Sequence, residues 1–163
     1  ILNELRKRIK NSLSQTNSNV YAKDGMDISF CTIDLQTNKL QFAGAYNPLY
    51  INRKNESGDY QLIETKGDKQ PVAVYYRETP FTNHTIQLQT DDRIYLFSDG
   101  YIDQNGGEKG KKFLKKNFKT LLTRMQDKTM NEQCEALNQT IDKWMTGNYT
   151  QVDDMLIIGA KIR

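Results

Sequence analysis

The chain has 163 residues, a formal net charge of +3 and a hydrophobic content of 37%. This length suits one domain with a hydrophobic core of its own, and this composition excludes wholesale disorder. The small net charge gives no reason to expect a nucleic-acid partner. No apolar run reaches the roughly 18 residues that a membrane span needs, so we expect no insertion into a bilayer.

Hydrophobic periodicity predicts three helices. Leu2, Leu5, Ile9 and Leu13 recur at helical spacing, which predicts an amphipathic helix over residues 1–14. Apolar residues at the same spacing predict two further helices, over residues 113–125 and 130–144.

Runs of β-forming residues between turn signals predict seven strands. They are expected over residues 28–35, 39–43, 49–53, 60–64, 85–89, 93–97 and 155–162. Strands 28–35 and 39–43 should form a hairpin, and strands 85–89 and 93–97 a second pair that turns at Asp91-Asp92. Antiparallel hairpins with helices clustered between them predict an α+β layered domain.

The two cysteines lie in periodic patterns rather than in a disulfide framework. Cys31 belongs to a strand pattern and Cys134 to a helix pattern, so both are expected to be small buried hydrophobic residues. This usage is typical of a reducing compartment and predicts a cytoplasmic protein. The chain begins at Ile1, without Met and inside the first predicted helix, so we expect it to be cut from a longer protein.

Two acidic sequences stand where apolar strands end or begin. Asp99 follows strand 93–97 within Ser98-Asp99-Gly100, and Asp153-Asp154 precedes the last strand. A carboxylate at such a junction is held at the edge of a core and points outward, and hard cations such as Mg²⁺ bind oxygen ligands of this kind. Asp99 is equally compatible with a strand-ending turn, and the acidic pair with plain solubility. Neighbouring side chains of a strand face opposite ways, so one of the pair would face a site and the other would pair locally.

Other candidate sites are weaker. His84 is the single histidine, so neither a zinc cluster nor a Ser-His-Asp arrangement is predicted. The lysines between 109 and 119 could bind phosphate, but the apolar residues among them favour an amphipathic helix with a basic solvent face. The glycine-rich residues 106–110 lack the pattern of a nucleotide-binding loop.

Five short motifs follow one another along the chain. They are Asp24-Gly25-Met26-Asp27-Ile28, Ala43-Gly44-Ala45-Tyr46-Asn47-Pro48-Leu49-Tyr50, Gly67-Asp68-Lys69-Gln70-Pro71-Val72, Leu96-Phe97-Ser98-Asp99-Gly100-Tyr101 and Asp153-Asp154-Met155. In this order they resemble the stage II sporulation protein E-type (SpoIIE) phosphatases, the bacterial branch of the metal-dependent protein phosphatase 2C (PP2C) superfamily. The resemblance covers nearly all of residues 20–163.

The resemblance implies a fold, an activity and a metal site. The fold would be a four-layer α-β-β-α sandwich of two antiparallel sheets flanked by helices. The activity would be hydrolysis of phosphoserine or phosphothreonine on a regulatory protein, with two Mg²⁺ or Mn²⁺ ions sharing the attacking water. Asp99 and Asp153 would be metal ligands, with local support from Gly100, Asp103 and Asp154, and no catalytic residue is expected beyond the ligands.

The chain also departs from the family pattern. Family members carry Gly-Asp-x-x-Asp and Asp-Gly-x-Gly motifs on N-terminal strands, and neither precedes the first helix here. Where other branches place an acid for a further metal, this chain has Ala45. We therefore expect residues 1–163 to be the C-terminal two-thirds of one phosphatase domain, with one side of the metal site, weak or no metal binding, and little activity of their own.

Partners follow from the same expectations. The parent protein would act on a phosphorylated protein and would carry an upstream sensor domain. Without the N-terminal strands, a sheet edge bearing Ile28, Phe30, Phe42 and Leu96 would be uncovered and would favour self-association, unless the helix of residues 1–14 folds over it. The alternative function is a non-catalytic regulatory or protein-interaction module that keeps the phosphatase fold.

Overall fold

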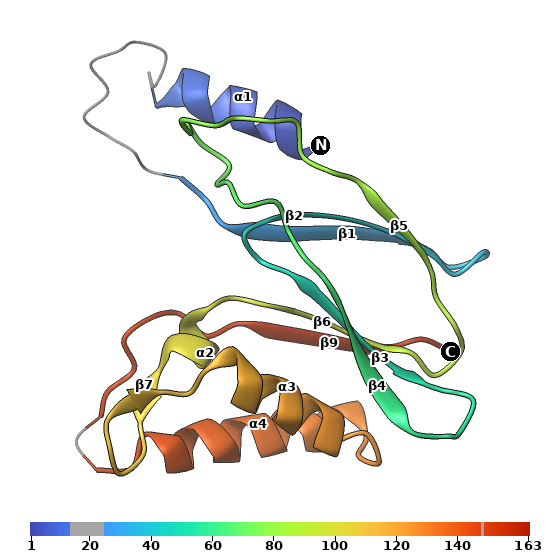
Figure 1. Cartoon of the computed structure of the whole chain (residues 1–163), viewed down its shortest axis with the longest axis vertical. Helices are drawn as coiled ribbons and strands as arrows, with labels where there is room; N and C mark the ends of the chain where they lie inside the picture. The colour runs from blue at the N-terminus through green and yellow to red at the C-terminus, as the bar shows by residue number, and fades with distance from the viewer. Residues whose placement is uncertain (14–24, 148) are drawn as a thin grey trace. The chain divides into compact units, whose positions relative to one another are not determined.

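The structure is a computed structural model that describes residues 1–13, 25–147 and 149–163. Its helices and strands occur in mixed order along the chain (Figure 1). They divide into two compact units, one formed by Ile1–Leu49 and Glu64–Leu88 and the other by Tyr50–Ile63 and Gln89–Arg163. Among the helices of the described residues, none is both long enough and apolar enough to cross a bilayer.

The first unit contains a three-stranded antiparallel sheet in the order β1-β2-β5. Strands β1 (Ile28–Asp34) and β2 (Lys39–Ala45) form the predicted hairpin, in a register that runs from Ile28↔Ala45 to Asp34↔Lys39. The Asp34 carboxylate accepts the N–H groups of Gln36 and Thr37, which closes the turn. Strand β5 (His84–Gln87) pairs with the other side of β2.

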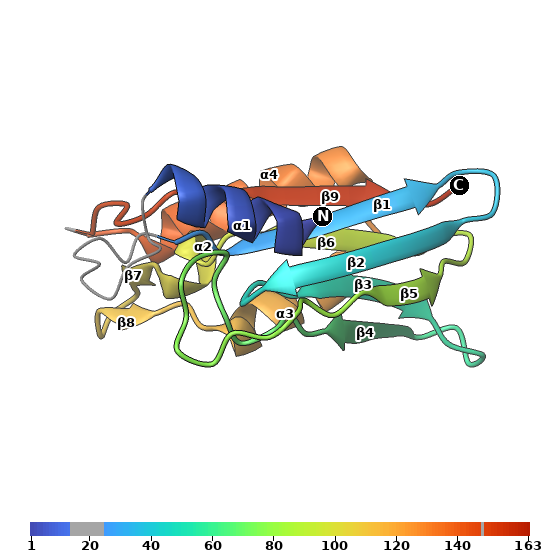
Figure 2. The same ribbon diagram turned by 90° about the horizontal axis from the view of Figure 1, so that it is seen from above.

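Helix α1 (Leu2–Ser12) lies over β1 and β2 in this unit (Figure 2). Its apolar stripe, which includes Leu2 and Leu5, packs in a cluster with Ile28 and Phe30 of β1. Phe42 is fully buried. Ile28 and Phe30 are half-buried beneath α1, as in the alternative in which the first helix folds over this edge. The expectation that Phe42 would be uncovered is wrong.

A buried arginine fastens α1 to the segment before β5. The Arg6 guanidinium donates to Gln70 Oε1 at 3.0 Å and to the Thr79 carbonyl at 2.7 Å. Asp68 serves the same segment, because its carboxylate accepts from the Thr82 N–H at 2.7 Å and the Thr82 hydroxyl at 3.0 Å. Gln70 and Asp68 of the 67–72 motif therefore stabilise the segment before β5. Asp24, which opens the first motif, lies outside the described residues, as does residue 14 of the first predicted helix.

The second unit is built on a four-stranded antiparallel sheet in the order β4-β3-β6-β9, to which β3 and β4 contribute most of their residues. These strands span Leu49–Lys54 (β3), Tyr60–Thr65 (β4), Arg93–Phe97 (β6) and Ile157–Lys161 (β9). Strand β6 pairs with β3 through Tyr50↔Tyr95 and with β9 from Arg93↔Lys161 to Phe97↔Ile157.

The predicted pairing of strands 85–89 and 93–97 is wrong. Strand β5 pairs with β2 of its own sheet, and β6 pairs with β3 and β9 of the other. The turn between them is real: Asp91 has φ 72°, and the Asp92 carboxylate accepts the Gln89 N–H. The ladder partners, however, come from distant segments. Leu88, for example, donates its N–H to the Asn38 carbonyl.

Two helices cover one face of the second sheet (Figure 1). Helices α3 (Lys115–Arg124) and α4 (Met130–Trp144) confirm the predicted positions. Phe118 and Leu122 of α3 and Leu137 of α4 pack on Tyr50 and Phe97 of the sheet in one core. The glycine-rich segment forms a two-stranded ribbon, β7 (Asn105–Gly106) with β8 (Lys111–Lys112). Both cysteines were expected to be buried. Cys31 is only half-buried, and Cys134 is exposed on α4, which contradicts the expectation for Cys134.

Candidate metal centre

Strand β6 delivers Asp99 to the point where the sheet ends. Buried residues of β6 precede it, and the short helix α2 (Gly100–Asp103) follows it. Tyr101 and Ile102 of α2 are buried in the core, and the Asp103 N–H donates to the Asp99 carbonyl at 2.9 Å. The Asp99 side chain itself is exposed. A rigid backbone therefore holds this carboxylate in solvent.

Ser98 joins the Asp99 loop to the segment that carries Asp153 and Asp154. Its hydroxyl donates to the Asp154 carbonyl at 2.7 Å and accepts the Leu156 N–H at 2.9 Å. The Ser98 N–H also donates to the Leu156 carbonyl at 2.9 Å. Three hydrogen bonds at one residue thus bring together two acidic segments that lie more than 50 residues apart in the sequence.

Gly100 allows this approach to be close. A Cβ at position 100 would overlap the Asp154 carbonyl oxygen and would lie 3.3 Å from the Asp153 carbonyl carbon. Any side chain here would push the two segments apart. The glycine of the Ser-Asp-Gly motif therefore serves close packing.

Gln104 secures the other end of the acidic segment. It is fully buried directly after α2, and its amide nitrogen donates to the Thr150 carbonyl at 2.8 Å. Its amide oxygen accepts the Val152 N–H at 3.2 Å. Sequence reasoning missed the positioning roles of Ser98 and Gln104. The available signal was a small hydroxyl residue before Asp-Gly and an uncharged amide after a buried turn of helix.

The acidic pair lies in a bend before β9, because that strand begins only at Ile157. The prediction that Asp153 and Asp154 face opposite sides of a strand therefore does not apply. Both side chains are exposed, and Asp153 Oδ1 accepts the Asp154 N–H at 2.7 Å. Asp103 instead forms an ion pair with Lys112 at 2.8 Å, so the support that it gives to Asp99 is through its backbone.

The charges near these segments match part of a metal site. Asp99 and Asp153 offer exposed carboxylate oxygens, the ligands that hard divalent cations prefer. Among the described residues, however, no three His, Cys, Asp or Glu side chains gather closely enough to hold an ion. Asp99 and Asp153 are therefore the candidate ligands that the junction of these two segments presents to solvent.

Comparison with known proteins places the chain. All of residues 1–163 match the family described as Stage II sporulation protein E (SpoIIE). The chain belongs to the SpoIIE family. No curated protein matches this SpoIIE-family chain.

Solved structures share its fold. The SiaA-PP2C domain of Pseudomonas aeruginosa is similar with a TM-score of 0.76 and 24% identity, over 97% of this chain and 58% of that one. The phosphatase domain of the cell fate determinant SpoIIE from Bacillus subtilis is similar with a TM-score of 0.59 and 18% identity, over 99% of this chain and 71% of that one. The same domain presoaked with Mn gives 0.60 and 19%, with the same coverage. The fold is therefore PP2C-like α+β, as predicted, and the chain spans 58% of the SiaA structure.

Proposed function

We propose that this SpoIIE-family chain is the C-terminal portion of a metal-dependent protein serine/threonine phosphatase domain. The complete domain hydrolyses phosphoserine or phosphothreonine on a regulatory protein and is coupled to an upstream sensor domain. The observation that carries the proposal is the junction of Ser98 and Gly100 with Asp154, which sets Asp99 and Asp153 on adjoining segments. Family membership and the PP2C-like fold support it.

In this proposal the residues of the junction divide into metal ligands and residues that position them. Asp99 and Asp153 are ligands of Mg²⁺ or Mn²⁺, and Ser98, Gly100 and Gln104 position the backbone that carries them. The ions, when bound, supply Lewis-acid activation of a water molecule. Metal ligands work only when their supports fix their orientation, so the hydrogen bonds of Ser98 and Gln104 matter as much as the carboxylates.

For the chain as it stands, we propose weak metal binding and little hydrolysis. Two-metal hydrolysis uses ligands that fix both ions at a set separation. The two carboxylates on the adjoining segments are too few for that task. The other carboxylates would come from the Gly-Asp-x-x-Asp and Asp-Gly-x-Gly motifs of a longer polypeptide.

The second candidate function is a non-catalytic regulatory or protein-interaction module with the same fold. The observation that favours it is the lack of a three-ligand cluster among residues 1–13, 25–147 and 149–163. In that case Asp99 and Asp153 would be surface residues of a turn.

One experiment separates the two functions. Hydrolysis of p-nitrophenyl phosphate and of phosphopeptides is measured with Mn²⁺ for this chain, for a longer polypeptide from the same reading frame, and for Asp99→Asn in each. The phosphatase proposal expects turnover by the longer polypeptide that the substitution abolishes, and little turnover by the shorter chain. Lys115→Glu, an exposed change on α3, is the control. A longer polypeptide that binds no Mn²⁺ and shows no turnover would establish the module instead.

A further inference from the structure

A second concentration of charge lies in the second unit, at the end of β6 and β9 opposite to Asp99. Arg93 opens β6 and pairs in register with Lys161, near the end of β9. Together with Lys128 and Arg163 these residues line a cavity of about 570 Å³, whose one acidic lining residue is Asp127. The lining of this cavity, which we call the basic cavity, is therefore strongly positive.

The decisive feature is the state of Arg93. Arg93 is only 7% exposed, and its Nε is buried with no hydrogen-bond partner within the described part of the chain. One guanidinium nitrogen donates to the Tyr60 hydroxyl at 2.9 Å, and the guanidinium lies 5.2 Å from the centre of the Tyr60 ring. No carboxylate among the described residues forms an ion pair with it. The pKa of Asp91 is lowered chiefly by its hydrogen bond to Lys161 and to a smaller extent by the charge of Arg93, so Asp91 is a more distant negative neighbour of this guanidinium. A buried cation with no carboxylate at ion-pair distance is costly.

A comparison with the neighbouring Arg53 shows what is unusual about Arg93. Arg53, on the adjacent strand β3, has a carboxylate partner in Asp92 at 2.6 Å. That bond raises the pKa of Arg53. Arg93 is more deeply buried than Arg53, yet its close partners among the described residues are the hydroxyl and the ring of Tyr60. A bound anion would provide the close negative charge that Arg93 does not receive from any described residue.

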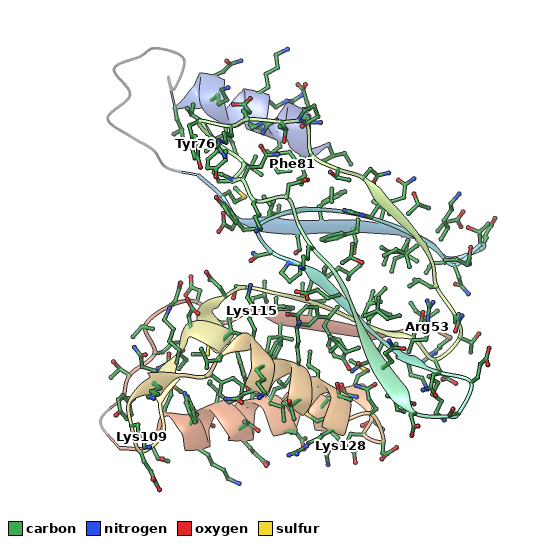
Figure 3. All side chains as sticks on the ribbon, viewed as in Figure 1. Arg53, Tyr76, Phe81, Lys109, Lys115 and Lys128 are labelled. Atoms are coloured by element: carbon green, nitrogen blue, oxygen red, sulfur yellow. The ribbon has the colours of Figure 1, made fainter. Side chains whose placement is uncertain are left out.

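The other cations leave the basic cavity positive. Lys161 forms an ion pair with Asp91 at 2.6 Å, which offsets part of its charge. Lys128 and Arg163 are exposed and form no ion pair with any described residue. Figure 3 shows Lys128 beside the N-terminal end of α4 and Lys109 and Lys115 elsewhere on the unit.

The N-terminus of helix α4 borders the basic cavity. This helix has 15 residues, and its capping box uses Thr129 and Glu132. The N–H groups of Met130 and Asn131, which also line the basic cavity, have no acceptor among the residues that the structure describes. Free N–H groups and the helix dipole favour an anion at such a position.

We propose that the basic cavity binds a phosphate group. A phosphate oxyanion offers several acceptor oxygens, which suits a guanidinium, two flexible cations and helix N–H groups together. The site stands at the opposite end of β6 from Asp99 and does not depend on a metal ion. It could receive free inorganic phosphate or the phosphate of a small phosphomonoester, and both present the same chemistry.

Calorimetric titration of the whole chain at low ionic strength, without divalent ions, tests this proposal. Inorganic phosphate and O-phosphoserine are titrated separately, which distinguishes the two sources, with chloride at equal ionic strength as reference. We expect binding of one phosphate group per chain, and a loss of affinity of about tenfold or more in Lys128→Glu, because that change reverses a charge at the cavity. Lys115→Glu makes the same charge change on α3 and should leave the affinity within about twofold.

Arg93→Gln removes the buried cation and is read by the phosphate-dependent rise in the unfolding temperature. Wild type should show this rise and the variant should lose it. Because Arg93→Gln could affect folding, Lys128→Glu carries the test on its own. No binding by wild type, or equal losses in Lys128→Glu and Lys115→Glu, would overturn the proposal.

Discussion

Replacing Gly100 by alanine tests the packing that joins the two acidic segments. Position 100 opens α2, where alanine is intrinsically favoured over glycine by about 1 kcal/mol. The added methyl group would overlap the Asp154 carbonyl oxygen, which belongs to backbone that cannot simply rotate away. Overpacking of this kind costs about 1–3 kcal/mol. The steric cost exceeds the gain in helix propensity, so we expect a net decrease of about 1–2 kcal/mol in the free energy of unfolding.

The same substitution should weaken metal binding. Relief of the overlap requires the segment of Asp153 and Asp154 to move by on the order of 1 Å, and residues that support ligands typically cost about 10–100-fold in metal affinity when changed. Mn²⁺ binding measured by electron paramagnetic resonance, at millimolar metal, reports this loss. Urea unfolding followed by circular dichroism reports the stability.

Gly58→Ala is the matched control. Gly58 has φ +87° with no atom within 4 Å of an added Cβ, so alanine there is strained without a clash. The strain costs about 1–2 kcal/mol, similar to the cost at position 100, but should leave Mn²⁺ affinity unchanged. If Gly100→Ala is as stable as wild type or more stable, helix propensity decides the outcome and the packing argument is wrong. Equal Mn²⁺ affinity in both variants would separate Asp154 from the metal centre.

Three further predictions concern pH, thiol chemistry and association. Hydrogen bonds from Thr129 hold the pKa of Glu132 below its usual range, so the stability that this cap contributes is present above the ordinary pKa and is lost as pH falls through the lowered one. The free energies of unfolding of wild type and Glu132→Gln, measured in urea across acid pH, should therefore converge at the acid end. Parallel curves would contradict this. Cys134 is exposed, whereas burial raises the pKa of the Cys31 thiol, so iodoacetamide should label Cys134 first by mass spectrometry; faster labelling of Cys31 would refute the assignment. Strand β9 is at the edge of its sheet within the described residues and carries an exposed Ile158, so we expect the chain to self-associate through this edge. Light scattering after size exclusion should then show a molecular mass that rises with concentration. A monomer at every concentration would refute association through β9.

The sequence by itself determined the elements whose signal is local. The apolar spacing in α3 and α4 predicts both helices because one helix face is buried whatever it packs against. The hairpin of β1 and β2 follows from two β-forming runs and a short polar turn. Asp99 and the acidic pair stand out for the same local reason, since each adjoins an apolar strand.

Only the tertiary structure decided which distant segments meet. The local pattern predicted that β5 pairs with β6. Ladder hydrogen bonds, however, form with whichever strand also allows the apolar face to be buried, and β5 pairs with β2 instead. Ser98 and Gln104 act on backbone about 50 residues away, which no periodicity encodes. Arg93 looks in the sequence like the polar first residue of a strand. Its burial with no described carboxylate at ion-pair distance appears only when β6, β9 and the start of α4 come together, because burial and charge compensation are properties of the packed neighbourhood.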